Sequence, residues 1–90
     1  MVEEKTIQKE NTNDSTEKVR NLILFNDDFN TFEFVIETLI DVCKHEPEQA
    51  EQCTLIVHFK GKCAVKSGSF TELKPIFTEM SNRNLTVEIN

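Results

Sequence analysis

Apolar residues occur along this chain in short blocks, and the spacing inside each block predicts its secondary structure. Residues 19–25 contain the run LILF between polar neighbours, a pattern typical of a strand buried on both faces. From Phe32 to Cys43 the apolar positions follow i, i+3, i+4, i+7, i+8 and i+11, which predicts an amphipathic helix. Asn30 precedes this helix and Glu33 stands three residues later, so we expect their side chains to form a capping box.

A second helix and a second strand follow. Pro47 is suited to the first turn of a helix, and Gly61 to the position just after its last turn. We therefore expect a helix between these two residues. Residues 63–65 are expected to form a short strand, and residues 68–69 a turn.

The last third of the chain predicts one more helix and one more strand. The helix is expected to begin near Thr71, because Pro75 is tolerated only among the first positions, whose N–H groups have no partner within the helix. Residues 85, 87 and 89 are apolar and alternate with polar residues, as in a half-buried strand. The predicted order is β-α-α-β-α-β. Because a few short strands are not stable alone, the helices must pack on them, and the fold class is α+β: a two-layer sandwich with a small three-stranded sheet.

Length and charge limit what the chain does. Ninety residues support one modest domain. Residues 1–18 are polar with mixed charges, so we expect a disordered tail before a domain over residues 19–90. The formal net charge of −6 argues against binding to nucleic acid or to an anionic membrane surface. We find neither a signal peptide nor an apolar run that could cross a membrane.

The cysteines indicate a reducing compartment. Cys43, Cys53 and Cys63 are an odd number in a chain with no export signal, which favours free thiols and a cytoplasmic protein. Their even spacing differs from the close cysteine pairs of zinc sites. We expect neither a bound metal nor a cofactor.

The triplet Asn26, Asp27 and Asp28 is the most informative polar group. It stands where the first strand leads into the first helix. An α-ammonium group presents three N–H donors and one positive charge, and acceptors that include an ionised carboxylate suit it well. A polar turn that caps the following helix would also explain this triplet.

His58 lies in the run LIVHF near the end of the second helix. A neutral imidazole offers one acceptor and one donor to a ligand, although a histidine here could instead interact with the helix dipole. His45 is expected at the surface, without a role. A cysteine–histidine enzyme would need a thiol beside His58, but Cys53 stands five residues earlier, about 140° around the helix. We therefore expect no enzymatic activity.

Two blocks of the sequence resemble the ClpS adaptor family. Residues 22–36, LILFNDDFNTFEFVI, are similar to that family's hydrophobic strand followed by N-D-D-aromatic and then E-F-V. Residues 50–62, AEQCTLIVHFKGK, are similar to its A-x-x-x-(Met)-L-x-V-H-aromatic-x-G-K. The distance between the two blocks also fits without a gap. From residue 63 onward the similarity is only general.

The resemblance implies a fold shared with the C-terminal domain of the ribosomal stalk protein. It implies an adaptor that binds proteins with a free N-terminal Phe, Tyr, Trp or Leu, the bacterial N-end rule signals (N-degrons). The adaptor would deliver them to the Clp protease through the N-terminal domain of a AAA+ unfoldase of the ClpA or ClpC kind. We expect it to act as a monomer. The alternative is a module of the same fold that docks on an unfoldase and modulates it without reading N-terminal residues.

Carried over position by position, the resemblance gives eight site residues. The α-amino group and first peptide unit would be held by Asn26, Asp27 and His58, and the rim would be lined by Asp28 and Asn30.

Phe32, Thr54 and Val57 would shape a hydrophobic pocket for the first side chain of the substrate. Two of these depart from the family pattern, because Phe32 and Thr54 each stand where Met is usual. Met is adaptable, whereas Phe is rigid and Thr is small and polar. The preference for the first residue therefore depends on these two positions.

Overall fold

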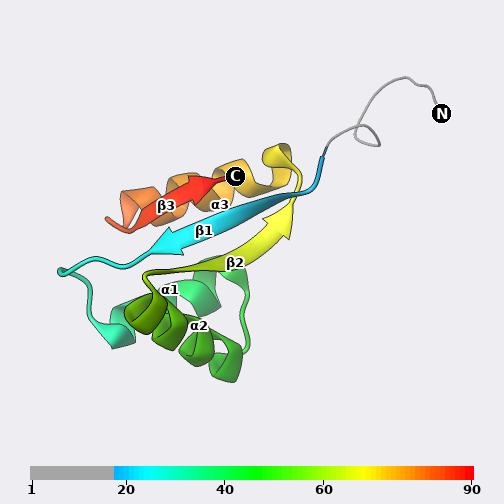
Figure 1. The fold of residues 1–90 in the computed structure, drawn as a ribbon. Coiled ribbons are helices and arrows are strands. Elements are labelled where there is room, and N and C mark those ends of the chain that lie inside the picture. The colour runs from blue at the N-terminus through cyan, green and yellow to red at the C-terminus, as the bar shows by residue number, and fades with distance from the viewer. Residues whose placement is uncertain (1–17) are drawn as a thin grey trace, which may run out of the picture.

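The computed structural model describes residues 18–90, which form six elements in the predicted order. The strands are β1 (Arg20–Phe25), β2 (Lys62–Gly68) and β3 (Thr86–Ile89), and the helices are α1 (Phe32–Cys43), α2 (Pro47–Lys60) and α3 (Phe70–Asn82). The strands form one antiparallel sheet in the order β2-β1-β3, with the helices packed against it (Figure 1). The prediction of an α+β sandwich is confirmed.

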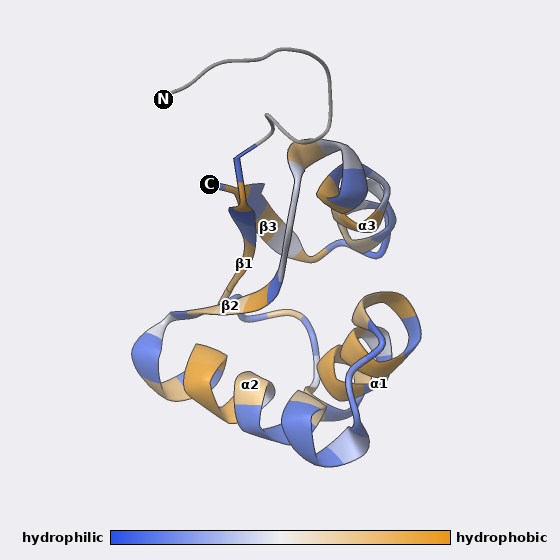
Figure 2. Cartoon of the chain, turned by 90° about the vertical axis from the view of Figure 1, so that its right-hand side faces the viewer, coloured by the Kyte–Doolittle hydropathy of each residue, from blue (hydrophilic) through white to orange (hydrophobic). Residues whose placement is uncertain are grey.

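The central strand is β1, which pairs with β2 on one edge and β3 on the other. Leu22 and Leu24 of this strand are 0% and 1% exposed, whereas Ile23 between them is only half-buried. The prediction of a strand buried on both faces is therefore wrong. Successive side chains of a strand point to opposite faces, and the helices gather on one side of these strands (Figure 2).

The start of α1 also differs from the prediction. Its N-cap is Thr31, whose hydroxyl accepts a hydrogen bond from the Phe34 N–H at 3.1 Å. The expected capping box of Asn30 and Glu33 does not form, because Thr31 and not Asn30 is the N-cap residue. The Asn30 amide donates instead to Asp27 Oδ2 and to the Asn84 carbonyl.

The capping box of this fold belongs to α3. Ser69 Oγ accepts from the Glu72 N–H at 3.1 Å, and Glu72 Oε1 accepts from the Ser69 N–H at 2.8 Å. This cap starts the helix at Phe70, one residue earlier than expected. Pro75 consequently lies inside the helix and not among its first positions, contrary to the prediction.

The second helix has the expected limits. It begins at Pro47, and Gly61 follows it with a φ of 96°. The Gly61 N–H donates to the Val57 carbonyl at 2.9 Å, in the left-handed conformation that favours glycine after a helix. The strand β2 is longer than predicted because its pairing with β1 extends to Gly68.

His45 is buried, and its predicted place at the surface is wrong. It is 6% exposed, and its Nε2 lies 2.6 Å from the carbonyl oxygen of Val65. Lys44 leaves α1 with a φ of 62°, and the N–H of His45 donates to the Leu39 carbonyl at 3.2 Å. This turn folds the chain back towards the sheet and places His45 against it.

The expected disordered tail, residues 1–18, falls almost wholly on residues 1–17, which lie outside the described part of the chain, and it stays a prediction. Within residues 18–90, no helix has the length and apolar character needed to cross a membrane.

Candidate functional site

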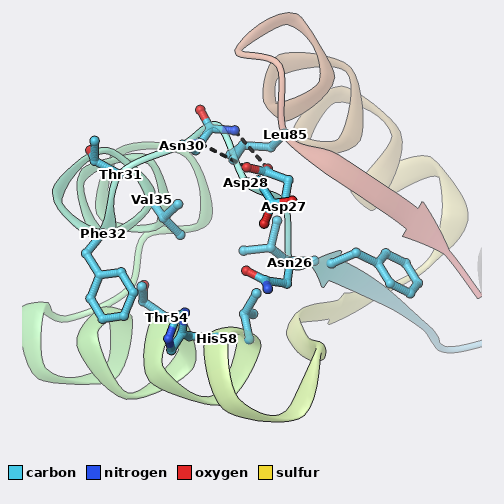
Figure 3. A pocket seen from close by; sticks show the side chains of 13 residues that line it. Asn26, Asp27, Asp28, Asn30, Thr31, Phe32, Val35, Thr54, His58 and Leu85 are labelled. Carbon is cyan, nitrogen blue, oxygen red and sulfur yellow. Dashed lines mark hydrogen bonds between the residues drawn. The ribbon is translucent and has the colours of Figure 1, made fainter.

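A cavity of about 310 Å³ opens where the β1–α1 loop, the start of α1 and the C-terminal half of α2 meet. All eight site residues of the sequence analysis line it (Figure 3): Asn26, Asp27, Asp28, Asn30, Phe32, Thr54, Val57 and His58. Five further residues complete the lining: Leu24, Phe25, Thr31, Val35 and Leu85. The structure thus brings the eight predicted residues together around one cavity, and the sequence analysis did not include the other five lining residues.

One backbone contact sets the position of the loop relative to α2. The Asn26 N–H, at the end of β1, donates to the carbonyl of Gly61 at 2.9 Å. Because Gly61 caps α2, this bond brings the Asn26 side chain next to the last turns of that helix. In Figure 3, Asn26 and Phe32 lie on opposite sides of the opening, with His58 of α2 between them.

Asp27 organises the loop. Its Oδ1 accepts from the Phe29 N–H at 2.8 Å and from the Asn30 N–H at 2.9 Å, and its Oδ2 accepts from the Asn30 side-chain amide at 2.8 Å. Desolvation alone would raise the pKa of Asp27, but these hydrogen bonds outweigh it and hold the pKa below its ordinary value. The carboxylate is therefore negatively charged at neutral pH.

Asp27 retains capacity for a cationic ligand. An ionised carboxylate offers about four acceptor sites, and the loop occupies three of them. Asn30 carries the same network further, because its amide also donates to the Asn84 carbonyl at 3.0 Å. The β1–α1 loop is thereby tied to the turn before β3, which supplies Leu85 to the cavity wall.

His58 is exposed and stands between two aromatic rings. Its ring centroid lies 5.1 Å from that of Phe32 and 4.8 Å from that of Phe59, both in edge-to-face geometry. Phe32 lines the cavity and is 39% exposed. Phe59 is more exposed and lies outside the lining. The imidazole thus contacts two aromatic rings, and no group in residues 18–90 forms a hydrogen bond with its nitrogens.

The cavity has a polar mouth and an apolar floor. Asn26, Asp28 and His58 are exposed and stand at the opening. The lining residues that are buried are Leu24, Thr54, Val57 and Leu85. Such a site suits a ligand with a cationic or polar end and an apolar side chain.

The thiols give no sign of a nucleophile in this site. Burial, followed by the contact with the Cys63 thiol, raises the pKa of Cys53 to about 11, so the thiolate is scarce at neutral pH. Neither Cys53 nor Cys63 lines the cavity. Among the described residues, no group of three or more His, Cys, Asp or Glu side chains could hold a metal ion.

Leu85 is the lining residue that sequence reasoning could least have found. It lies just before β3, in the part of the chain where the family similarity is only general. The alternation of apolar and polar residues around it predicted that Leu85 is buried, but not which residues it contacts. Val35 and Leu24 lay inside the recognised block, so their apolar periodicity was a usable signal.

Comparisons with known proteins show which family this chain resembles. A family model described as "ATP-dependent Clp protease adaptor protein ClpS" matches residues 15–87. The ClpS adapter protein of Nitratidesulfovibrio vulgaris is 40% identical over 55 residues, which are 59% of this chain and 55% of that protein. The ClpS adapter protein of Acetivibrio thermocellus is 44% identical over 64 residues, 69% of this chain and 65% of that protein. The chain thus spans between half and two thirds of these relatives.

A solved structure shares the fold. It is Agrobacterium tumefaciens ClpS2 bound to L-phenylalaninamide, with a TM-score of 0.70 and 20% identity. The match covers 82% of this chain and 96% of the other.

Asp27→Asn tests whether the charged carboxylate stabilises the loop. Because the folded pKa of Asp27 is lowered, its stabilising contribution is complete above the reference pKa of about 3.9 and is lost as the pH falls through the folded value. We expect the variant to be less stable at pH 7 by about 1 kcal/mol, with a smaller difference in acid. Denaturant unfolding at several pH values measures this. The control is Asp28→Asn, whose exposed side chain should tolerate the change; equal losses in both variants would contradict the interpretation.

Proposed function

This chain belongs to the ClpS family, a family of adaptors rather than enzymes, and from that premise we propose that it binds the N-terminal residue of substrate proteins. The proposed ligands are proteins with a free N-terminal Phe, Tyr, Trp or Leu. The chain delivers them to a Clp protease for degradation.

The observation that carries this proposal is the joint placement of acceptors and apolar side chains around one cavity. Asp27 is ionised with acceptor capacity to spare, and Asn26 and His58 stand at the same opening. An α-ammonium group needs such acceptors, since charge-assisted hydrogen bonds are roughly twice as strong as neutral ones. The buried floor next to them takes an apolar first side chain.

The solved relative supports the same class of ligand. Its ligand, L-phenylalaninamide, joins a free amino group to an aromatic side chain, as the first residue of a substrate does. We propose that this chain takes the amino group at Asn26, Asp27 and His58, with Asp28 and Asn30 at the rim. The side chain then enters between Phe32, Thr54 and Val57.

We further propose that the chain acts as a cytoplasmic monomer and docks on the N-terminal domain of a AAA+ unfoldase of the ClpA or ClpC kind. The family supports a Clp partner. The three cysteines are free thiols, as suits a reducing compartment.

Acetylation of the peptide N-terminus tests the proposal directly. It removes the positive charge and a donor, and leaves Asp27 and Asn26 facing a group that cannot satisfy them. We expect binding to weaken at least about tenfold, since an unsatisfied buried polar group costs about 1–3 kcal/mol. Titrations with matched free and acetylated peptides measure the effect. Equal binding would sink the N-degron proposal in favour of a module that docks on the unfoldase without reading N-termini.

The variant His58→Ala tests the role of His58. An imidazole nitrogen can accept a hydrogen bond from an α-ammonium group, and alanine removes that acceptor. We therefore expect His58→Ala to bind a peptide with a free N-terminus about two- to tenfold more weakly, since a hydrogen bond contributes about 0.5–1.5 kcal/mol. Peptide titrations at neutral pH measure the difference. If the alanine variant binds as tightly as the unmodified protein, His58 does not hold the amino group.

Phe32 is expected to exclude β-branched first residues. Val and Ile are stiff at χ1, and a rigid ring at the opening leaves little room for a second γ-carbon. Phe32→Ala should therefore admit peptides beginning with Val or Ile. The matched control is Phe59→Ala, which also loses a ring contact with His58 but leaves the cavity lining intact. If the unmodified protein binds Val as well as Leu, this account of the opening is wrong.

A further inference from the structure

The floor of the cavity contains a single polar side chain. Among the buried lining residues, the side chains of Leu24, Val57 and Leu85 are hydrocarbons, whereas that of Thr54 has a hydroxyl group. Thr54 is 3% exposed, so any group that reaches its oxygen does so away from bulk water. The other polar side chains of the lining stand at the mouth or in the loop beside it.

The hydroxyl of Thr54 is used as a donor but not as an acceptor. Its Oγ1 donates to the Ala50 carbonyl at 2.8 Å, one turn earlier in α2. A hydroxyl has one donor hydrogen and two acceptor lone pairs. Within the described residues nothing donates to those lone pairs. A ligand group that hydrogen-bonds to this oxygen while the bond to Ala50 is kept must therefore be a donor.

We propose that Thr54 makes this site prefer a first residue with a hydrogen-bond donor at the far end of its ring, above all tyrosine, over phenylalanine. This inference rests on the proposed function, in which the α-amino group stays at the mouth and the side chain enters the floor. A buried tyrosine hydroxyl needs a hydrogen-bond partner, and Thr54 Oγ1 is the acceptor that the buried side chains of the floor provide.

The size of the effect follows from ordinary hydrogen-bond energetics. A neutral hydrogen bond contributes about 0.5–1.5 kcal/mol net, which corresponds to a factor of about 2 to 12 in affinity. Purely apolar pockets discriminate poorly against an added hydroxyl, whereas a pocket that bonds the hydroxyl favours the ligand that carries it. We expect tyrosine peptides to bind about three- to tenfold more tightly than phenylalanine peptides.

The experiment compares peptides that differ only in their first residue: Tyr, Phe and 4-fluorophenylalanine. The fluorinated residue extends the ring at the same position as the hydroxyl but carries no donor. Each peptide is titrated into the unmodified protein, into Thr54→Val, which keeps the shape and removes the hydroxyl, and into Thr54→Ser, which keeps the hydroxyl. The tyrosine preference should hold in the unmodified protein and the serine variant, and should vanish or reverse in the valine variant.

Several results would overturn the inference. They are equal binding of Tyr and Phe, equal binding of Tyr and 4-fluorophenylalanine, or a tyrosine preference that survives in Thr54→Val. The comparison of three peptides on the unmodified protein decides the matter even if the valine variant does not fold, which thermal unfolding reveals. If one of these results is found but free peptides still bind more tightly than acetylated ones, only this inference fails and the proposed function holds. If no peptide with a free N-terminus binds, the proposed function fails together with this inference.

Discussion

The hydrogen bond from the Asn26 N–H to the Gly61 carbonyl is the contact on which the site depends. It joins the end of the central strand to the cap of α2, two points separated by 35 positions in the sequence. Strand β1 is itself fixed by its two partner strands and by the burial of Leu22 and Leu24. The core therefore determines where the β1–α1 loop begins. The position of that loop in turn determines where the polar side chains at the mouth of the cavity lie.

The loop is then ordered by its own side chains. Asp27 accepts three hydrogen bonds, and Asn30 passes the connection on to the turn before β3. Because these bonds form when the chain folds, the acceptors at the mouth are arranged before a ligand arrives. Preorganisation of this kind lowers the entropy lost on binding. The same carboxylate thus supports the fold and presents charge to the cavity.

In the proposed function, the mouth and the floor of the cavity have different roles. The acceptors at the mouth would bind any free α-amino group, and so would distinguish a protein N-terminus from an internal peptide. The floor and the ring of Phe32 would contact the side chain, and so would distinguish one N-terminus from another. His58 stands at the boundary, in contact with the Phe32 ring. Under this proposal, changes at positions 32 and 54 would alter selectivity without removing the recognition of the amino group.

The sequence by itself determined the order of the six elements and the eight candidate site residues, because periodicity, caps and two motif blocks are local signals. It could not determine which hydrogen-bond or packing partner each side chain has in the folded protein. Asn30 could cap a helix or bond to Asp27, and folding brought Asp27 within 2.8 Å of its amide. The burial of His45 and the place of Leu85 in the cavity wall likewise came from segments distant in sequence. Only the tertiary structure decided these points, since the energy of a polar or apolar group depends on the neighbours that the whole fold supplies.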